Sequence, residues 1–296
     1  MRTTDLGQPI GFRTAVAFFV YRRPHLARLA FASIRRSRPK RLYFIADAPK
    51  DSSDVESCAL SRELLGEIDW DCEVRSQLAE RHLGCARRIA SGVTWVFEQE
   101  DRAIFIEEDC IAAQSFFPFC DELLERYASV RSVMMLTGFN LLLEWKPAEG
   151  SYSFSHLGSS WGWATWRRAW AHFDCNLEAW TQDARDQVRS LLENDDVFAE
   201  RARLFDKVAK SRLDSWAVPW NLACLLRGGC CIVPSVNLIQ NVGFGDDSTH
   251  YKSQKDPNFG VPPSAMIFPL SHPPQVCVDR ELDGLWNRKA TGANKP

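Results

Sequence analysis

The sequence has no apolar run long enough to cross a membrane and no excess of one charge. Its 296 residues carry a formal net charge of −2, and the Lys and Arg residues are dispersed along the chain. A nucleic-acid-binding surface normally shows a basic excess or stripe, so we expect no nucleic-acid partner. The first apolar run, Ala15 to Tyr21, is far shorter than the roughly 20 residues of a transmembrane helix. Residues 1–12 are polar and contain Pro9, and they predict no signal peptide.

The chain also lacks any CxxC pair, although it contains 10 cysteines. Cys230 and Cys231 are adjacent, which is a poor arrangement for two ligands of one zinc ion. We interpret the cysteines as reduced, mostly buried small hydrophobic residues. Reduced thiols and the absence of a signal peptide predict a cytoplasmic location.

In the first half of the chain, apolar runs alternate with segments of helical periodicity. The length and the 45% hydrophobic content suit one large globular unit or two fused lobes. The alternation predicts an α/β fold whose mostly parallel sheet has helices on both faces. Ligands of such sheets bind at the carboxyl ends of the strands. The predicted strands are 14–21, 41–46, 70–77, 102–107 and 132–137, and the predicted helices begin at Pro24, span 52–66, follow Gly84 and span 116–130.

The second half breaks this rhythm and is mainly helical. Residues 138–160 are predicted to form a loop rich in Gly and Ser, and 230–234 a short strand. The last forty or so residues are rich in proline and are expected to wrap the surface. The predicted helices are 161–172, 183–194, 196–211 and 214–227.

The sharpest feature is an acidic triplet, Glu107, Glu108 and Asp109, directly after an apolar strand. Adjacent like charges repel one another, and burying them is costly unless a cation compensates. Carboxylate oxygens suit Mg²⁺ or Mn²⁺, which keep open positions for water and phosphate oxygens. The alternative is a solvated acidic loop. The place of the triplet at the end of an interior strand favours a metal site.

Further charged residues lie near predicted strand and helix ends. Asp47 ends the second strand, where it is either a turn or cap residue or an acceptor for a nucleotide-base N–H. Arg22 and Arg23 follow the first strand and match the geometry of a diphosphate. Arg87 and Arg88, near the start of the helix after Gly84, would add positive charge, although such pairs are commonly solvated.

The segment ARRIASGVTWVFEQEDRAIFIEEDCIAAQSFFPF resembles GT-A-fold glycosyltransferases, most closely the inverting N-acetylglucosaminyltransferase I type. The chain also resembles bacterial relatives labelled haemolysin-like, in which a strand ends in YRRP. The family pattern is Glu-Asp-Asp, so Glu108 departs from it. The resemblance implies that Asp109 binds Mn²⁺ or Mg²⁺ and that Glu107 contacts the donor sugar. It also makes Asp47 the uracil-binding aspartate, and hence the donor a UDP-sugar.

A tryptophan cluster occupies the position of the acceptor-side loop and helix of this fold. Trp161, Trp163 and Trp166 cannot all share one helical face. Aromatic faces stack on sugar rings, and the indole N–H is a hydrogen-bond donor. We therefore take these three residues as candidates for binding the acceptor, with a core wedge between lobes as the alternative for each.

Two further residues acquire roles through the resemblance. Asp214 precedes a predicted helix and by composition is an ordinary N-cap. The resemblance makes it the general base that takes the acceptor proton. His250 lies in the polar loop NVGFGDDSTH, and many GT-A enzymes bring such a histidine to the metal or diphosphate. Lone histidines are more often structural or solvated.

Together these features predict a metal-dependent glycosyltransferase. It would move a hexosyl or N-acetylhexosaminyl group from a UDP-sugar to a glycan or another hydroxyl acceptor, with inversion. Residues 1–140 would bind the nucleotide sugar, 141–250 the acceptor, and 251–296 would form a surface tail. A sugar-nucleotide pyrophosphorylase would need a glycine-rich loop after the first strand, and YRRPHLARL contains no glycine. A non-catalytic carbohydrate-binding protein on a decayed transferase scaffold is the remaining alternative.

Overall fold

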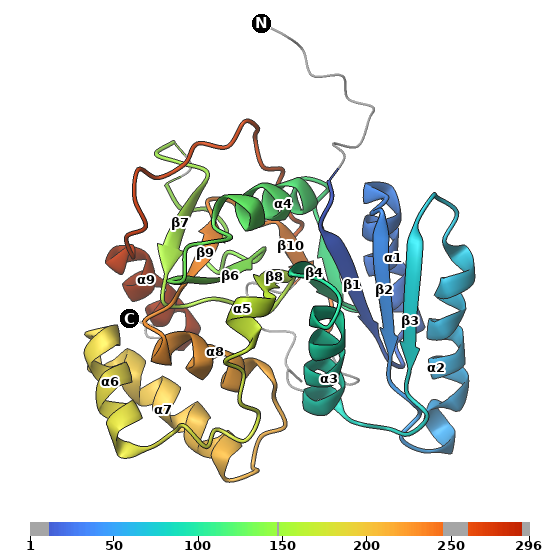
Figure 1. Ribbon diagram of the computed structural model, residues 1–296, viewed down its shortest axis with the longest axis horizontal. Helices are drawn as coiled ribbons and strands as arrows, with labels where there is room; N and C mark the ends of the chain where they lie inside the picture. The colour runs from blue at the N-terminus through green and yellow to red at the C-terminus, as the bar shows by residue number, and fades with distance from the viewer. Residues whose placement is uncertain (1–11, 147, 245–259, 292–296) are drawn as a thin grey trace, which may run out of the picture.

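The computed structural model describes residues 12–146, 148–244 and 260–291. An eight-stranded sheet with the order β3-β2-β1-β4-β8-β6-β9-β7 forms its centre (Figure 1). Strands β7 and β8 run antiparallel to their neighbours, and the other strands are parallel to one another. The strands are β1 (Ala15–Val20), β2 (Arg41–Ala46), β3 (Glu73–Leu78), β4 (Arg102–Glu107), β6 (Val133–Thr137), β7 (Tyr152–Ser155), β8 (Trp163–Trp166) and β9 (Cys230–Pro234).

Helices cover both faces of this sheet, as the sequence predicts. Alternate side chains of a strand point to opposite faces, and on β1 Val16 and Phe18 belong to one core cluster, whereas Ala17 and Phe19 belong to the other. The first cluster includes side chains of α1 (Pro24–Ser37) and α4 (Phe116–Arg126). The second includes side chains of α3 (Cys85–Phe97), α5 (Arg167–Trp170), α6 (Gln182–Leu192), α7 (Asp195–Ala209), α8 (Ala217–Leu226) and α9 (Arg280–Thr291).

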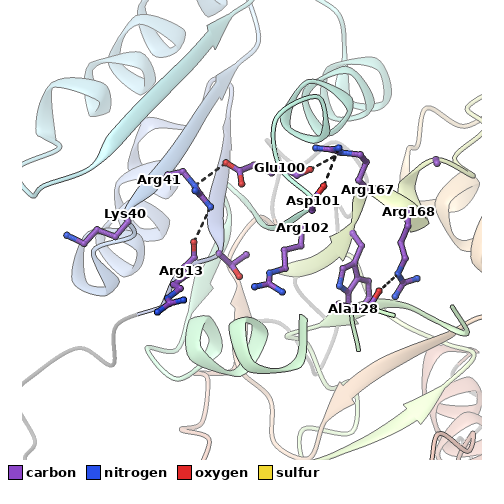
Figure 2. A pocket seen from close by; sticks show the side chains of 12 residues that line it. Arg13, Lys40, Arg41, Glu100, Asp101, Arg102, Ala128, Arg167 and Arg168 are labelled. Atoms are coloured by element: carbon purple, nitrogen blue, oxygen red, sulfur yellow. Dashed lines mark hydrogen bonds and ion pairs between the residues drawn. The ribbon is translucent and has the colours of Figure 1, made fainter. Parts of the chain in front are cut away.

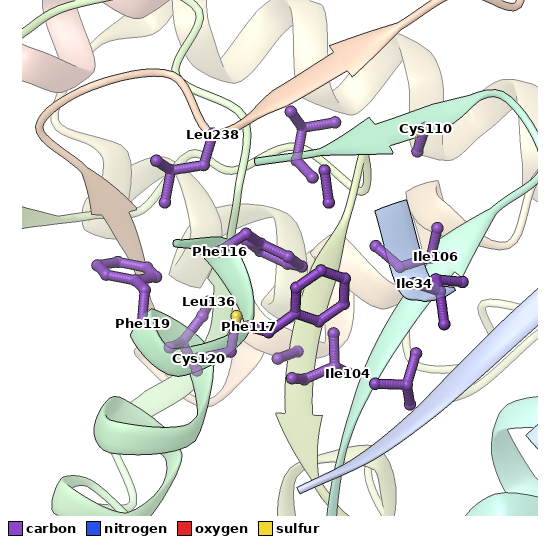
Figure 3. Packing of buried hydrophobic residues seen from close by; sticks show 14 of the residues in the cluster. Ile34, Ile104, Ile106, Cys110, Phe116, Phe117, Phe119, Cys120, Leu136 and Leu238 are labelled. Carbon is purple, nitrogen blue, oxygen red and sulfur yellow. The ribbon is translucent and has the colours of Figure 1, made fainter. Parts of the chain in front are cut away.

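An aromatic core beneath α4 fixes the position of β4. Phe116, Phe117 and Phe119 are fully buried and lie near Ile104 and Leu136 in the same cluster (Figure 3). Each such side chain contributes about 1.5–3 kcal/mol when it leaves water. This packing holds the strand that delivers the acidic triplet.

The remaining elements lie at the edges of the sheet. Helix α2 (Val55–Arg62) and two 3-10 turns, 52–54 and 63–67, connect β2 to β3. Strands β5 (Cys110–Ala112) and β10 (Ile239–Asn241) form a separate antiparallel ribbon. Strand β5 directly follows the acidic triplet, and its pairing with β10 brings Ile239–Asn241 close to the triplet.

The structure confirms the predicted elements of the first half, apart from small shifts in their bounds, and corrects three predictions in the second. The predicted helix 161–172 is wrong, because β8 pairs antiparallel with both β4 and β6 before the short helix α5 begins. The predicted loop 138–160 contains β7, and the predicted surface tail contains α9. The boundary near residue 140 falls inside one continuous sheet, so the roles assigned to each half stay predictions.

The cysteines fit the interpretation drawn from the sequence. All ten are free, and six of them are buried. Across the described ranges, no helix is both long and apolar enough to cross a membrane.

Candidate functional site

The acidic triplet lies at the carboxyl ends of β1 and β4, as predicted. Glu107 is the last residue of β4 and is in register with Phe19 of β1. Glu108 is 4% exposed, and its Oε2 accepts a hydrogen bond from the Tyr21 N–H at 2.6 Å. Burial of Glu108 excludes the interpretation of this segment as a solvated acidic loop.

One arginine holds two of the three acids. Arg23 donates from Nε to Glu108 Oε1 at 2.7 Å and from Nη2 to Asp109 Oδ2 at 2.9 Å. Its side chain is 17% exposed. The neighbouring Arg22 pairs instead with Asp54 at 2.9 Å. The sequence placed both arginines near a diphosphate and contained no signal that Arg23 would face the acids.

The chain after β10 closes over Asp109. The Val242 N–H donates to the Asp109 carbonyl at 2.9 Å, and Arg23 Nη1 donates to the Gly243 carbonyl at 3.4 Å. A Cβ at Gly243 would overlap the Asp109 carboxylate. Only glycine therefore fits beside this acid. His250, the predicted second metal ligand, lies outside the described residues.

Glu107 has an unusual electrostatic environment. Burial is the largest cause that raises its pKa, to about 8, and the charges of Asp109 and Glu108 add to this, while Arg23 opposes it. No described residue donates a hydrogen bond to its carboxylate. The triplet therefore combines three acids with one guanidinium, and a further positive charge would offset the remaining negative charge.

Asp214 lies at the start of α3, near the acidic triplet, although it is distant from the triplet in sequence. Its Oδ2 is 3.5 Å from the position that a Cβ of Gly84 would occupy. Gly84 is the N-cap of α3 and has a φ of 80°, which favours glycine. Burial, followed by the charges of Glu107, Asp214 and Asp109, raises the pKa of the next residue, Cys85. Carboxylates from two separate segments, residues 107–109 and Asp214, therefore lie near the first residue of α3.

Asp214 is exposed and does not cap α8, so the interpretation of this residue as an N-cap is wrong. The N-cap of α8 is Trp216, which makes no side-chain capping bond. Ser215 Oγ accepts the Val218 N–H at 3.4 Å instead. The carboxylate of Asp214 is consequently left for another role.

Asp47 lies next to the end of β1, as predicted, but its carboxylate is largely occupied. It is 4% exposed, and its N–H donates to the Val20 carbonyl at 3.2 Å. Oδ1 accepts the Leu83 N–H and Oδ2 accepts the Gly84 N–H, each at 3.0 Å. Asp47 thereby fixes the loop that leads into α3.

An aromatic pair beside Asp47 has no recognisable signal in the sequence. The rings of Tyr21 and His82 stack with centroids 5.2 Å apart. His82 Nδ1 lies 3.0 Å from Asp47 Oδ2, and the Tyr21 hydroxyl donates to Asp54 at 2.6 Å. The pair is partly exposed at the carboxyl end of β1.

Two of the three tryptophans in the cluster are buried in the core, and the third is partly exposed. Trp163 and Trp166 are 1% and 3% exposed, since alternate residues of β8 enter opposite core clusters. This corrects the expectation that they bind the acceptor, because neither ring has a face left for a sugar. Trp161 is partly exposed and contacts Phe139 and Phe244, with ring centroids 4.6 and 5.5 Å away.

The two arginines near the start of α3 differ in their exposure to solvent. Arg87 is exposed in the first turn, while Arg88 is buried and donates to Gln77 on β3. Arg88 is therefore a structural residue. Only Arg87 stays a candidate for contact with a charged ligand.

The site suits a metal ion that binds one or two protein carboxylates and completes its coordination with water or phosphate oxygens. The described ranges contain no group of three His, Cys, Asp or Glu side chains able to enclose an ion. Mg²⁺ and similar ions usually take one or two carboxylates plus water and phosphate oxygens. Arg23 donates to Oδ2 of Asp109, and the Cys110 thiol at 3.5 Å is the one hydrogen-bond partner of Oδ1 among the described residues. Asp109, with Glu107, therefore offers a fitting set of oxygen ligands.

No protein-family model and no curated protein sequence matches the chain. Among solved structures, it is similar to the galactosyltransferase LgtC in complex with donor and acceptor sugar analogs, with 10% identity, a TM-score of 0.39, and 74% of this chain and 73% of that one covered. It is similar to the mannosyltransferase PcManGT from Pyrobaculum calidifontis in complex with GDP-Man and Mn²⁺, with 10% identity, a TM-score of 0.39 and 74% of each chain covered. It is also similar to S. aureus TarS 1–349, with 9% identity, a TM-score of 0.42, and 77% and 59% covered. With identities and TM-scores this low, these likenesses carry no argument about function.

Proposed function

We propose that the chain is a metal-dependent glycosyltransferase that moves a sugar from a UDP-sugar to a hydroxyl acceptor with inversion. The observation that carries this proposal is the meeting of Glu107, Asp109 and Asp214 around the start of α3. Glu107 and Asp109 belong to the acidic triplet, whereas Asp214 comes from a segment far along the chain. Such a meeting at the carboxyl edge of a mostly parallel sheet is typical of a binding site.

Asp109, together with Glu107, would hold Mn²⁺ or Mg²⁺. When bound, the ion offsets the negative charge that develops on the leaving diphosphate. Arg23 already faces this position, and Arg22 and Arg87 are the further cations that we assign to the diphosphate. Glu107 would also contact the donor sugar, and Glu108 would act mainly by orienting Arg23, which it bonds at 2.7 Å.

The nucleotide base would lie beside Asp47. Oδ1 accepts the Ala48 and Leu83 N–H groups, while Oδ2 accepts the Gly84 N–H and lies 3.0 Å from His82 Nδ1. A base N–H would therefore take the place of His82 at Oδ2. The stacked rings of Tyr21 and His82 offer an adjacent aromatic face. This arrangement supports a uracil base.

Asp214 would take the proton from the acceptor hydroxyl as it attacks the anomeric carbon. Its exposure and its absence from the helix cap support this role. Trp161 stays as the aromatic candidate for the acceptor, because it is partly exposed and contacts Phe244 next to Gly243.

A donor screen tests the proposal directly. Release of nucleoside diphosphate is measured for a panel of nucleotide sugars with and without Mn²⁺, for the wild type, Asp109→Ala and Asp71→Ala. Asp71 is the matched control because its side chain is 95% exposed and it lies just before β3, at the amino ends of the parallel strands. We expect Mn²⁺-dependent release by the wild type and Asp71→Ala only. Equal release by all three proteins contradicts a metal-dependent mechanism.

A non-catalytic carbohydrate-binding protein is the second candidate, and one observation favours it. Arg23 already compensates Glu108 and Asp109, so these acids form a stable pair without a metal ion. Calorimetric titration with Mn²⁺ and UDP separates the two candidates. A binding module is expected to show no response to either, whereas the transferase is expected to bind both.

A further inference from the structure

A cavity lies at the amino ends of the parallel strands, opposite the acidic triplet. Its volume is about 980 Å³, within the range of small-molecule sites. Thr14 and Trp166 line it, together with residues at the amino ends of β2 and β4 (Figure 2). The acidic triplet lies at the carboxyl end of the same β4, so the two sites are distinct.

Arginines from adjacent strands converge on this cavity. Arg41 begins β2, Arg13 lies two residues before β1, and Arg102 begins β4. These strands are neighbours in the sheet. Arg167 and Arg168 follow β8, whose antiparallel direction brings its carboxyl end to the same edge, where Trp166 is in register with Arg102. With Lys40, six cations line the cavity against two acids, Glu100 and Asp101.

The acids that neutralise these cations are mostly solvated. Arg102 pairs with Glu125, which is 73% exposed, and Arg167 pairs with Asp101, which is 90% exposed. Lys40 pairs with Asp71 on the rim. Exposed pairs of this kind contribute only about 0–1 kcal/mol. An incoming anion would therefore displace these carboxylates at little cost.

Two of the arginines have donors to spare. No described residue accepts a hydrogen bond from the Arg13 guanidinium, which is exposed at the mouth. Arg41 Nε pairs with Glu100 at 3.1 Å and Nη2 donates to the Arg13 carbonyl at 3.3 Å, while no described residue accepts a hydrogen bond from Nη1. Arg168 differs, because its guanidinium donates to carbonyls between the end of α4 and the start of β6, at Tyr127, Ala128, Val130 and Val133, and stacks on Trp166. It forms a wall of the cavity.

We propose that this cavity binds a phosphate group, with Arg13, Arg41 and Arg102 as its ligands. Guanidinium groups match phosphate oxygens in bidentate geometry. A dianionic phosphate competes better than a monoanionic carboxylate with Glu100 and Asp101, which already lie in the cavity. The volume leaves room for the rest of a phosphate ester, or for the headgroup of an anionic lipid.

Calorimetric titration with inorganic pyrophosphate tests the site on protein freed of divalent ions with a chelating resin. Removing the ions suppresses metal-dependent pyrophosphate binding at the acidic triplet. We compare the wild type with Arg13→Gln/Arg102→Gln and with Arg36→Gln, an exposed arginine of α1 that does not line the cavity. The double variant is expected to bind at least about tenfold more weakly, because it loses two charge-assisted hydrogen-bonding groups. Arg36→Gln is expected to stay within about twofold of the wild type.

Three further measurements make the result decisive. The wild-type affinity should fall as salt is raised, and UDP binding in the presence of Mn²⁺ should be equal in all three proteins. Co-sedimentation with phosphatidylcholine vesicles, with or without phosphatidic acid, identifies a lipid source if binding needs phosphatidic acid and is lost in the double variant. Arg13→Gln alone, which breaks no described side-chain contact, replaces the double variant if that protein does not fold. Pyrophosphate affinity that is absent, or equal in every variant, overturns the proposal.

Discussion

Arg23 and Asp109 form an ion pair, with Nη2 2.9 Å from Oδ2, that joins the carboxyl ends of β1 and β4. The same guanidinium bonds the buried Glu108. Burial lowers the pKa of Arg23, but the charges of Asp109 and Glu108 and the hydrogen bonds to them outweigh this effect and raise the pKa, so the guanidinium stays protonated. The acidic triplet is therefore anchored by a cation from the segment between β1 and α1, which offsets part of the cost of burying its charges.

Replacing Arg23 should destabilise the fold. Arg23→Gln leaves Glu108 buried without its charged partner, and loss of one member of a buried pair costs about 3–5 kcal/mol. Chemical denaturation should show this loss in the free energy of unfolding. Arg28→Gln on the same helix removes an exposed pair with Glu67 and should cost less than about 1 kcal/mol. Similar losses in both variants would mean that the buried pair contributes little.

Asp109 should be needed for metal binding but not for folding. In Asp109→Ala we expect the calorimetric signal for Mn²⁺ to disappear and Mn²⁺-dependent donor hydrolysis to stop. The melting temperature should change little, because Arg23 keeps its bond to Glu108. Full donor hydrolysis in this variant, or in the wild type with excess chelator, would refute the metal-dependent mechanism.

Asp214 should contribute to turnover and not to stability. General bases typically contribute about 10²–10⁴-fold, so Asp214→Asn should slow single-turnover transfer by this factor while UDP affinity stays constant. Ser215→Ala is the matched control, since Ser215 accepts the Val218 N–H at the start of α8. It should lower the melting temperature slightly and retain transfer. Transfer by Asp214→Asn within a few-fold of the wild type would move the search for the base to Glu107.

The raised pKa of Glu107 predicts a pH dependence of stability in the metal-free protein. Its pKa is about 8 in the folded state against an ordinary value of 4.5, so the folded state binds the proton more tightly than the unfolded state. The contribution to stability is full below about pH 4.5 and is lost as the pH rises through 8. Glu107→Gln should remove this part of the decline, whereas Glu98→Gln on the exposed end of α3 should keep it. Denaturation curves across this range measure the difference, and parallel curves for the wild type and Glu107→Gln would contradict it.

Asp47 should affect both the nucleotide and the loop before α3. Asp47→Ala removes the acceptor for the base N–H and should weaken UDP binding by about 1.5–3 kcal/mol. It also frees the Leu83 and Gly84 N–H groups, so the melting temperature should fall. Titration well below that temperature separates the two effects. An unchanged UDP affinity would place the base elsewhere.

Elements with a strong local pattern were predictable from the sequence. The strands β1, β2 and β4 are continuous apolar runs, and α3 carries its apolar residues on one face. Strand β8 was not predictable, because its four residues WATW are all buried and form too short a stretch to distinguish a strand from a helix. It is a strand because pairing with β4 and β6 satisfies its backbone, and this pairing is visible only in the fold.

The sequence by itself determined that the acidic triplet ends a buried strand and that Asp47 ends another, because both facts follow from local apolar runs. Only the tertiary structure decided that Arg23 faces the acids and that Asp214 lies next to Gly84 at the start of α3. It also brought arginines that are far apart in the sequence to one cavity at the amino ends of the parallel strands. The reason is physical: strand order and helix packing bring together charges that lie far apart along the chain, and no local pattern encodes that order.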